Sequence, residues 1–120
     1  PSMVKAMRIQ DKARSAGFDW EEKEQVLDKV EEELKELRAE LKSGNTTRIE
    51  SEFGDLMFSL VNFSRFIDVN PEEALERTNR KFIARFVYLE EAAAKAGKNL
   101  KDMSLSEMDV YWNEAKAKGL

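Results

Sequence analysis

The sequence predicts an all-α protein, built as an antiparallel helical bundle. Ala, Leu, Glu and Lys are abundant, whereas the 120 residues include only five Gly and two Pro, and this composition favours helix. Apolar residues recur at helical spacing, and no segment shows the apolar–polar alternation of a strand. Because short loops join long amphipathic segments, neighbouring helices should pack antiparallel. The chain length suits one domain, residues 1–120.

The first two helices are bounded by a glycine and a capping signal. Residues 2–16 form the first helix, and Gly17 stops it. The second runs from about Trp20 to Leu41, with Asp19 at its N-cap and Glu22 closing a capping box three residues later.

The last two helices also begin at capping residues. Asn70 at N-cap and Pro71 at N1 open the fourth helix, which should extend to about residue 96. A second capping box, formed by Ser104 and Glu107, opens a short last helix through Trp112.

The composition excludes several classes of function. A net charge of −4 without a basic block argues against a nucleic-acid partner. No apolar run is long enough to cross a membrane and no signal-peptide pattern is present, so we expect a cytoplasmic protein without a membrane partner. Because the chain begins with Pro1 rather than Met, we expect it to be processed or to be a domain of a longer protein. With no His and no Cys, any metal site must use carboxylates.

Two carboxylates border the core-facing stripe of the second helix. At 100° per residue, Glu33 falls just beside this stripe, and Glu36 lies a little further round the same edge. Residues three apart are neighbours on a helix, with about 5–6 Å between their Cβ atoms. The stripe that we expect to be buried comprises Val26, Val30, Leu34, Leu37 and Leu41.

The third helix repeats this arrangement. Thr46 or Thr47 should cap it, and it should end near Ile67. Glu52 and Asp55, again three apart, lie together on one flank, which Ser59 and Asn62 continue. The expected core stripe here comprises Ile49, Phe53, Leu56, Leu60 and Ile67.

The two acidic pairs would face each other if these helices were antiparallel neighbours. Four semi-buried carboxylates repel one another unless a cation neutralises them, and hard divalent cations prefer oxygen ligands. Gly54, which costs about 1 kcal/mol against Ala in a helix, would let another helix approach the site closely. The alternative is that both pairs are solvated surface charge, as acidic pairs on helices commonly are.

Basic and aromatic side chains follow in the last two helices. Lys81 and Arg85, four apart, lie on one edge of the fourth helix, where they would neutralise phosphate oxygens or belong to a solvated face. Trp112 would stack on a base or belong to the core, and Trp20 and Phe18 are further aromatic candidates. The stripe of the fourth helix comprises Leu75, Thr78, Phe82, Phe86 and Leu89.

Several segments resemble the MazG-type nucleoside triphosphate pyrophosphohydrolases. That family's signature is E-E-x-x-E, a spacer and E-x-x-D; here KVEEELKE supplies the first part and ESEFGDLMFSLVNFSRF the second, with 15 residues between Glu36 and Glu52. RIQDKARSAGFDW resembles the lead-in of the carboxy-terminal MazG domain. ERTNRKFIARF is similar to its N-x-K-F-x-x-R-F segment, and EMDVYWNEAK to its closing tryptophan helix.

The resemblance implies a Mg²⁺-dependent enzyme, with Mn²⁺ as a substitute, that cleaves NTPs between the α- and β-phosphates into NMP and pyrophosphate. It implies a homodimer that completes the helical bundle. Phe58 and Val61, off the main stripe of the third helix, would then face the second copy or form a second core layer within one chain. The metal ligands carry over to Glu33, Glu36, Glu52 and Asp55.

Further roles follow from the same resemblance. Glu32 would be the general base or would interact with a metal ligand without binding the metal; the alternative is that it is a surface residue. The expected nucleotide contacts are Lys29, Glu32, Arg48, Ser51, Lys81, Arg85 and Trp112. The competing class is a non-catalytic helical module for dimerisation or partner binding, in which the carboxylates are surface charge. A carboxylate-bridged di-iron bundle would need Glu-x-x-His motifs, which a chain without His lacks.

Overall fold

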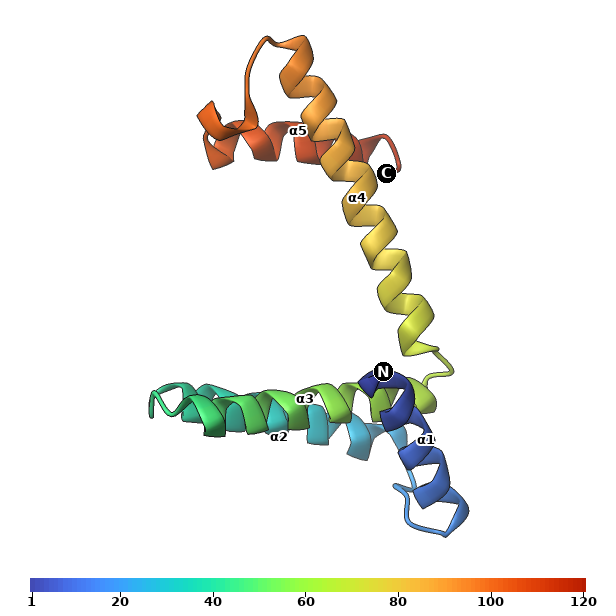
Figure 1. Ribbon diagram of the computed structural model, residues 1–120. Helices are drawn as coiled ribbons and strands as arrows, with labels where there is room; N and C mark the ends of the chain where they lie inside the picture. The colour runs from blue at the N-terminus through green and yellow to red at the C-terminus, as the bar shows by residue number, and fades with distance from the viewer. The chain divides into compact units, whose positions relative to one another are not determined.

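The computed structural model describes residues 1–120 and confirms the all-α class (Figure 1). The chain forms five α-helices and one 3₁₀ turn, with no strand. It divides into two compact units, Pro1–Glu72 and Glu73–Leu120, each described by itself below. The elements are α1 (Ser2–Ser15), α2 (Lys23–Leu41), α3 (Thr46–Phe66), α4 (Pro71–Lys95), η1 (Leu100–Asp102) and α5 (Leu105–Ala117). No helix is long and apolar enough to span a bilayer.

The first unit is built on the hairpin of α2 and α3. These helices run antiparallel side by side, and α1 packs against α3 (Figure 1). Val26 of α2 and Val61 of α3 are buried. Gln10 ties α1 to α3, because its Nε2 donates a hydrogen bond to the backbone oxygen of Phe58 at 3.0 Å.

Two of the expected helix caps are wrong. α2 begins at Lys23, with Glu22 at N-cap and Gln25 closing the box, and the Glu22 N–H donates to Gln25 Oε1 at 3.1 Å. Asp19 instead forms an ion pair with Arg65 at 3.0 Å. Asn45 caps α3, as its Oδ1 accepts from the Arg48 N–H at 3.1 Å, which agrees with the stronger N-cap preference of Asn over Thr.

The other helix boundaries follow the expected signals with one exception. Gly17 adopts φ +87° just after α1, and the Glu72 N–H donates to Asn70 Oδ1 at 3.0 Å where α4 begins. α5 does not end at Trp112 but continues to Ala117. Gly119 adopts φ +84° just after α5, and this left-handed conformation turns the chain back toward the helix end. The Leu120 N–H then donates to the backbone oxygen of Ala115 at 3.0 Å.

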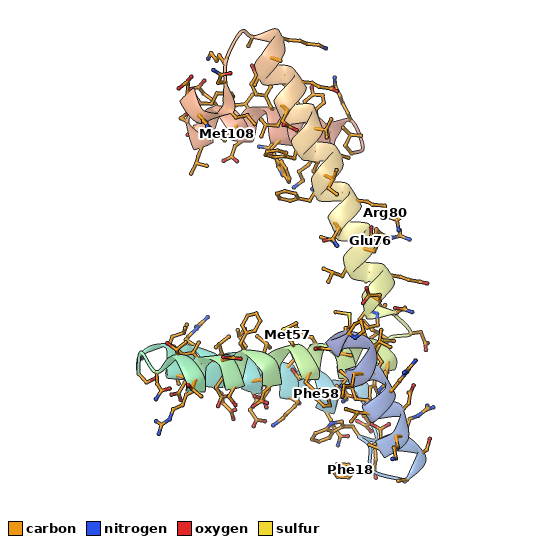
Figure 2. All side chains as sticks on the ribbon, viewed as in Figure 1. Phe18, Met57, Phe58, Glu76, Arg80 and Met108 are labelled. Atoms are coloured by element: carbon orange, nitrogen blue, oxygen red, sulfur yellow. The ribbon has the colours of Figure 1, made fainter.

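In the second unit, α5 crosses α4, and side chains of the two helices are in contact (Figure 1). The ring centroids of Phe82 and Trp112 lie 5.1 Å apart, and the Tyr88 hydroxyl donates to Glu114 Oε2 at 2.9 Å. Within α4, Glu76 and Arg80 form an i, i+4 ion pair at 3.6 Å (Figure 2). The buried apolar residues of this unit are Leu89, Ala93, Met103 and Ala115.

The expected core stripes are buried only in part: Val26 of α2 and Leu89 of α4 are buried, but many other members are exposed. Half-exposed side chains occupy much of the stripes of α2 and α3, with exposed fractions between 46% and 57% for Leu34, Leu41, Phe53 and Leu60. Ile67 is exposed as well, and so are Leu75, Phe82 and Phe86 of the α4 stripe. Each hairpin helix has one long neighbour, and one neighbour covers only part of a broad apolar face. Val61 is buried, whereas Phe58 is half-exposed beside α1.

Gly54 does not serve the close helix approach that we expected. A Cβ placed there would have no heavy atom within 4 Å beyond the helix itself. We therefore expect Gly54→Ala to raise the free energy of unfolding by about 0.5–1 kcal/mol, because Ala is the better helix former and meets no obstacle. Urea titration followed by circular dichroism measures this; destabilisation would show that a second chain packs against this position.

The capping box of α5 gives a pH prediction. Glu107 completes the Ser104 box and pairs with Lys98 Nζ at 2.9 Å; this ion pair first, and then the Ser104 N–H, lower the pKa of Glu107 from its ordinary 4.5. A lowered folded-state pKa gives stability that is full above about pH 4.5 and is lost as pH falls through the lower value. The melting temperature should therefore fall less between pH 6 and pH 3 in Glu107→Gln than in the parent. Glu90→Gln is the control, because Glu90 is exposed and has no ion pair, and its melting temperature should fall as much as that of the parent.

Candidate metal centre

Three carboxylates converge between α2 and α3. Glu33, Glu36 and Glu52 each offer one oxygen, and these three oxygens lie within 4.8 Å of one another. The two helices bring them together because Glu33 and Glu36 are one turn apart on α2 while Glu52 faces them from the antiparallel α3. Glu33 is buried, Glu52 is half-buried and Glu36 is exposed, so the cluster is open to solvent on one side.

The cluster contains acceptor oxygens without a partner. Oε2 of Glu33 and Oε2 of Glu52 are both buried and accept no hydrogen bond. The other oxygen of Glu33 pairs with Lys29 Nζ at 3.0 Å, which offsets part of the cost of burying that carboxylate. Two buried oxygens that have lost water without gaining a donor are unfavourable unless a cation takes their lone pairs.

Electrostatic repulsion within the cluster acts on Glu36. The pKa of Glu36 is raised above its ordinary 4.5, mainly by the negative charge of Glu33 and then by partial desolvation, with a further contribution from Glu52. Protonation of Glu36 would remove one negative charge from the cluster, and a bound cation would reduce the same repulsion.

The donor set fits a hard divalent cation. All three groups are carboxylates, which are the preferred ligands of Mg²⁺, and neither His nor Cys is present to favour a softer metal. An open side leaves room for water or substrate oxygens as further ligands.

Asp55 lies outside this cluster. It is exposed on α3, one turn beyond Glu52, and its side chain is one methylene shorter than that of Glu. Its assignment as the fourth metal ligand remains a prediction.

The predicted nucleotide contacts are distributed over both units. Lys29 bridges Glu33 and Glu32, with its Nζ 3.3 Å from Glu32 Oε1, and these two contacts raise the pKa of Lys29. Arg48 and Ser51 are exposed in the first two turns of α3. 

The other predicted contacts belong to the second unit. Lys81 is exposed. The Arg85 guanidinium lies 5.7 Å from the ring centroid of Trp112, and its Nε donates to the backbone oxygen of Leu120 at 2.8 Å. Trp112 is half-buried against Phe82, so one of its faces already has an aromatic neighbour.

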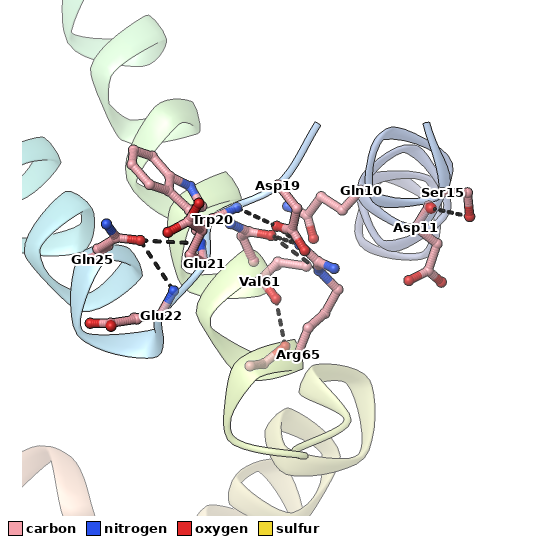
Figure 3. Close-up of polar contacts among 12 residues, drawn as sticks. Gln10, Asp11, Ser15, Asp19, Trp20, Glu21, Glu22, Gln25, Val61 and Arg65 are labelled. Carbon is pink, nitrogen blue, oxygen red and sulfur yellow. Dashed lines mark hydrogen bonds and ion pairs between the residues drawn. The ribbon is translucent and has the colours of Figure 1, made fainter. Parts of the chain in front are cut away.

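Sequence reasoning missed a second polar group in the first unit. Arg65 pairs with Asp19, and its Nε also donates to Asn62 Oδ1 at 3.1 Å (Figure 3). Gln10 lies close by and keeps a buried Oε1 without a hydrogen-bond partner. These residues line a cavity of about 410 Å³ between α1, the loop after it and α3. The sequence signals at this cavity were the polar flank of α3, on which Asn62 lies, and the aromatic residues Phe18 and Trp20.

The fold and the cluster together define an all-α protein with an acidic centre suited to a divalent cation. The MazG nucleotide pyrophosphohydrolase domain model matches residues 21–88, more than half of the chain. The chain belongs to this family. The matched segment contains all the carboxylates of the centre and crosses the boundary between the two units.

Three relatives illustrate the similarity. The chain is 46% identical over 116 residues to the nucleoside triphosphate pyrophosphohydrolase/pyrophosphatase MazG of Thermotoga maritima. It is 34% identical over 118 residues to a nucleoside triphosphate pyrophosphohydrolase of Escherichia coli K12. Each alignment covers 97% of this chain but only 44% and 45% of the relative, so the chain spans less than half of their length. A 68-residue segment, 57% of the chain, is 56% identical to 14% of an uncharacterized Bacillus subtilis protein, YabN.

Proposed function

We propose that this chain is a Mg²⁺-dependent nucleoside triphosphate pyrophosphohydrolase, which hydrolyses NTPs and dNTPs to NMP and pyrophosphate. The observation that supports this most is the pair of buried, unpartnered carboxylate oxygens on Glu33 and Glu52, one on each helix, within a cluster of three carboxylates. Membership of the MazG family supports the reaction class, and the names of the Thermotoga maritima and Escherichia coli relatives support the substrate class.

Glu33, Glu36, Glu52 and Asp55 would hold the ion, with Mn²⁺ as a substitute for Mg²⁺. When bound, such an ion neutralises phosphate oxygens and makes a water molecule more acidic. Lys29 holds Glu33 in place through its ion pair, and this contact orients the buried carboxylate toward the centre.

The proton and the leaving group need other residues. Glu32 is exposed next to Lys29 and would take the proton of the attacking water, whose oxygen forms a new bond to phosphorus as the bridging P–O bond breaks. Pyrophosphate leaves with the electrons of that bond. Lys81 and Arg85 would neutralise the charge that develops on it, and Arg48, Ser51 and Trp112 would complete the nucleotide contacts.

We also propose that the protein is a homodimer. Leu34 and Leu41 follow Glu33 by about 100° around α2, and Phe53 and Leu60 follow Glu52 by a similar angle around α3. Glu33 and Glu52 face each other across the hairpin. Because the two helices are antiparallel, the same rotation from each of these residues leads to the same side of the hairpin. These half-exposed side chains form one apolar face, and a large exposed apolar patch marks an interaction surface.

One reaction tests the proposed function. The purified protein is incubated with a mixture of NTPs and Mg²⁺, and the nucleotides and pyrophosphate are separated by anion exchange. We expect NMP and pyrophosphate in equal amounts, and none with EDTA. Intact NTPs would favour the alternative, a helical partner-binding module, and NDP with orthophosphate would show that another bond is cut.

A further inference from the structure

Lys29 places a positive charge at the edge of the carboxylate cluster. Its Nζ lies 3.0 Å from Oε1 of Glu33 and 3.3 Å from Oε1 of Glu32, so one ammonium group serves two carboxylates. The three residues share one face of α2, because Glu32 and Glu33 follow Lys29 by three and four positions. Through these contacts Lys29 balances part of the negative charge that a metal ion would balance.

The two ion pairs of Lys29 differ in their exposure to water. The side chain of Glu33 is 8% exposed, whereas that of Glu32 is 56% exposed. Loss of the contact with Glu33 would leave a buried charge without a partner, which is costly, whereas an ion pair with an exposed carboxylate forms and breaks at little cost. Lys29 therefore stays at Glu33 as long as no other cation reaches that carboxylate.

A metal ion and Lys29 would use the same carboxylate. Oε1 of Glu33 pairs with Lys29, and Oε2 of Glu33 is buried within the cluster without a hydrogen-bond partner. A divalent ion at Oε2 would lie close to the ammonium at Oε1, and like charges repel strongly where water is largely excluded. Either cation also removes the cost of burying Glu33, so the second cation to bind gains less from this carboxylate.

We propose that Lys29 is an exchangeable counter-ion, which leaves Glu33 and keeps only its ion pair with Glu32 when Mg²⁺ binds at the cluster. The inference rests on the proposed function for the identity of the ion. The ammonium is within 3.3 Å of Glu32 before any movement, so the exchange needs only side-chain rotation. It moves the positive charge of Lys29 from the buried carboxylate to the exposed one, and Glu33 is then held by the metal ion instead.

A binding measurement without nucleotide tests this exchange. Mg²⁺ is titrated into protein that has been treated with EDTA and desalted, and calorimetry gives the dissociation constant. Lys29→Met keeps the aliphatic stem but removes the charge, so we expect Mg²⁺ to bind about 10-fold more tightly. Lys29→Arg keeps the charge and should bind Mg²⁺ no more tightly than the parent. Lys35→Met is the matched control and should leave the dissociation constant unchanged, since Lys35 is exposed on the opposite side of α2 from Glu33.

A double-mutant cycle tests the role of Glu32 as the second partner. In Glu32→Gln, Lys29 has no other carboxylate to move to, so Mg²⁺ should bind about 10-fold more weakly than to the parent. Glu32→Gln also removes a negative charge near the ion, but that effect remains when residue 29 is uncharged. In the Lys29→Met background we therefore expect Glu32→Gln to weaken binding by less than about three-fold, and the difference measures the exchange.

Thermal unfolding guards against a folding defect in Lys29→Met. In EDTA this variant should melt below the parent, because the buried carboxylate of Glu33 has lost its partner. The same concentration of Mg²⁺ should then raise its melting temperature by more than that of the parent, since it binds the ion more tightly. A variant that only folded poorly would bind less Mg²⁺ rather than more.

The outcomes separate the two proposals. Tighter Mg²⁺ binding by Lys29→Met, together with no hydrolysis of any NTP by the parent, would support the exchange and overturn the proposed function. Unchanged or weaker binding by Lys29→Met, or equal effects of Glu32→Gln in both backgrounds, would overturn the exchange. The proposed function would still stand in that case if the parent binds Mg²⁺ and hydrolyses NTPs. If neither the parent nor Lys29→Met binds Mg²⁺, both proposals are overturned.

Discussion

Glu52→Gln is expected to lower NTP hydrolysis in Mg²⁺ by about 100-fold or more. Mutation of a residue that only hydrogen-bonds a metal ligand already lowers metal affinity or activity by about 10–100-fold. Glu52 belongs to the carboxylate cluster itself, so its loss should have a larger effect. Gln keeps the volume of the side chain but removes its negative charge, and Oε2 of Glu52 is one of the two buried oxygens without a partner.

The same variant separates loss of the metal from loss of the fold. Mg²⁺ at 100 times its dissociation constant should stabilise the parent by about 2.7 kcal/mol, and this gain should vanish in Glu52→Gln. Without Mg²⁺ the variant should be no less stable than the parent, since one charge that repels Glu36 is gone. Glu50→Gln is the matched control, two residues earlier on α3 and exposed. Full activity in Glu52→Gln would remove the carboxylate cluster from the mechanism.

Leu60→Asp is expected to convert the proposed dimer to a monomer. Leu60 is 49% exposed within one chain and lies in the middle of the apolar face of the α2–α3 hairpin. A carboxylate at the centre of an apolar interface would lose its water without gaining a partner, so the dimer dissociation constant should rise by about 100-fold or more. The fold of one chain should persist, because half of this side chain is already in water.

Sedimentation equilibrium measures this change directly. Ala39→Asp adds the same charge on the other side of α2, away from Leu34 and Leu41, and should leave the association unchanged. If the parent sediments as a monomer, or if Leu60→Asp remains a dimer, the apolar face is not the subunit interface.

Local signals predicted most of the secondary structure. The Ser104–Glu107 capping box and the glycines after α1 and α4 set helix boundaries within one or two residues, because a cap depends on atoms only a few positions apart. The start of α2 was misplaced, because Asp19 has a stronger partner in Arg65, 46 residues away, and this partner is not visible in a local pattern.

The carboxylates were predictable and the cavity was not. Glu33, Glu36 and Glu52 border apolar stripes at helical spacing, so an antiparallel hairpin can bring them near one another, as the structure does. The orphan oxygen of Gln10 depends on the packing of α1 against α3, and no periodicity relates residue 10 to residue 58.

By itself, the sequence determined the helices, the faces on which their acidic and apolar residues lie, and the family resemblance, since all of these depend on residue order along one chain. The tertiary structure decided which side chains are buried: it left the apolar stripes of α2 and α3 half-exposed and buried two carboxylate oxygens without donors. Burial depends on which helices become neighbours, and spacing along one helix does not contain that information.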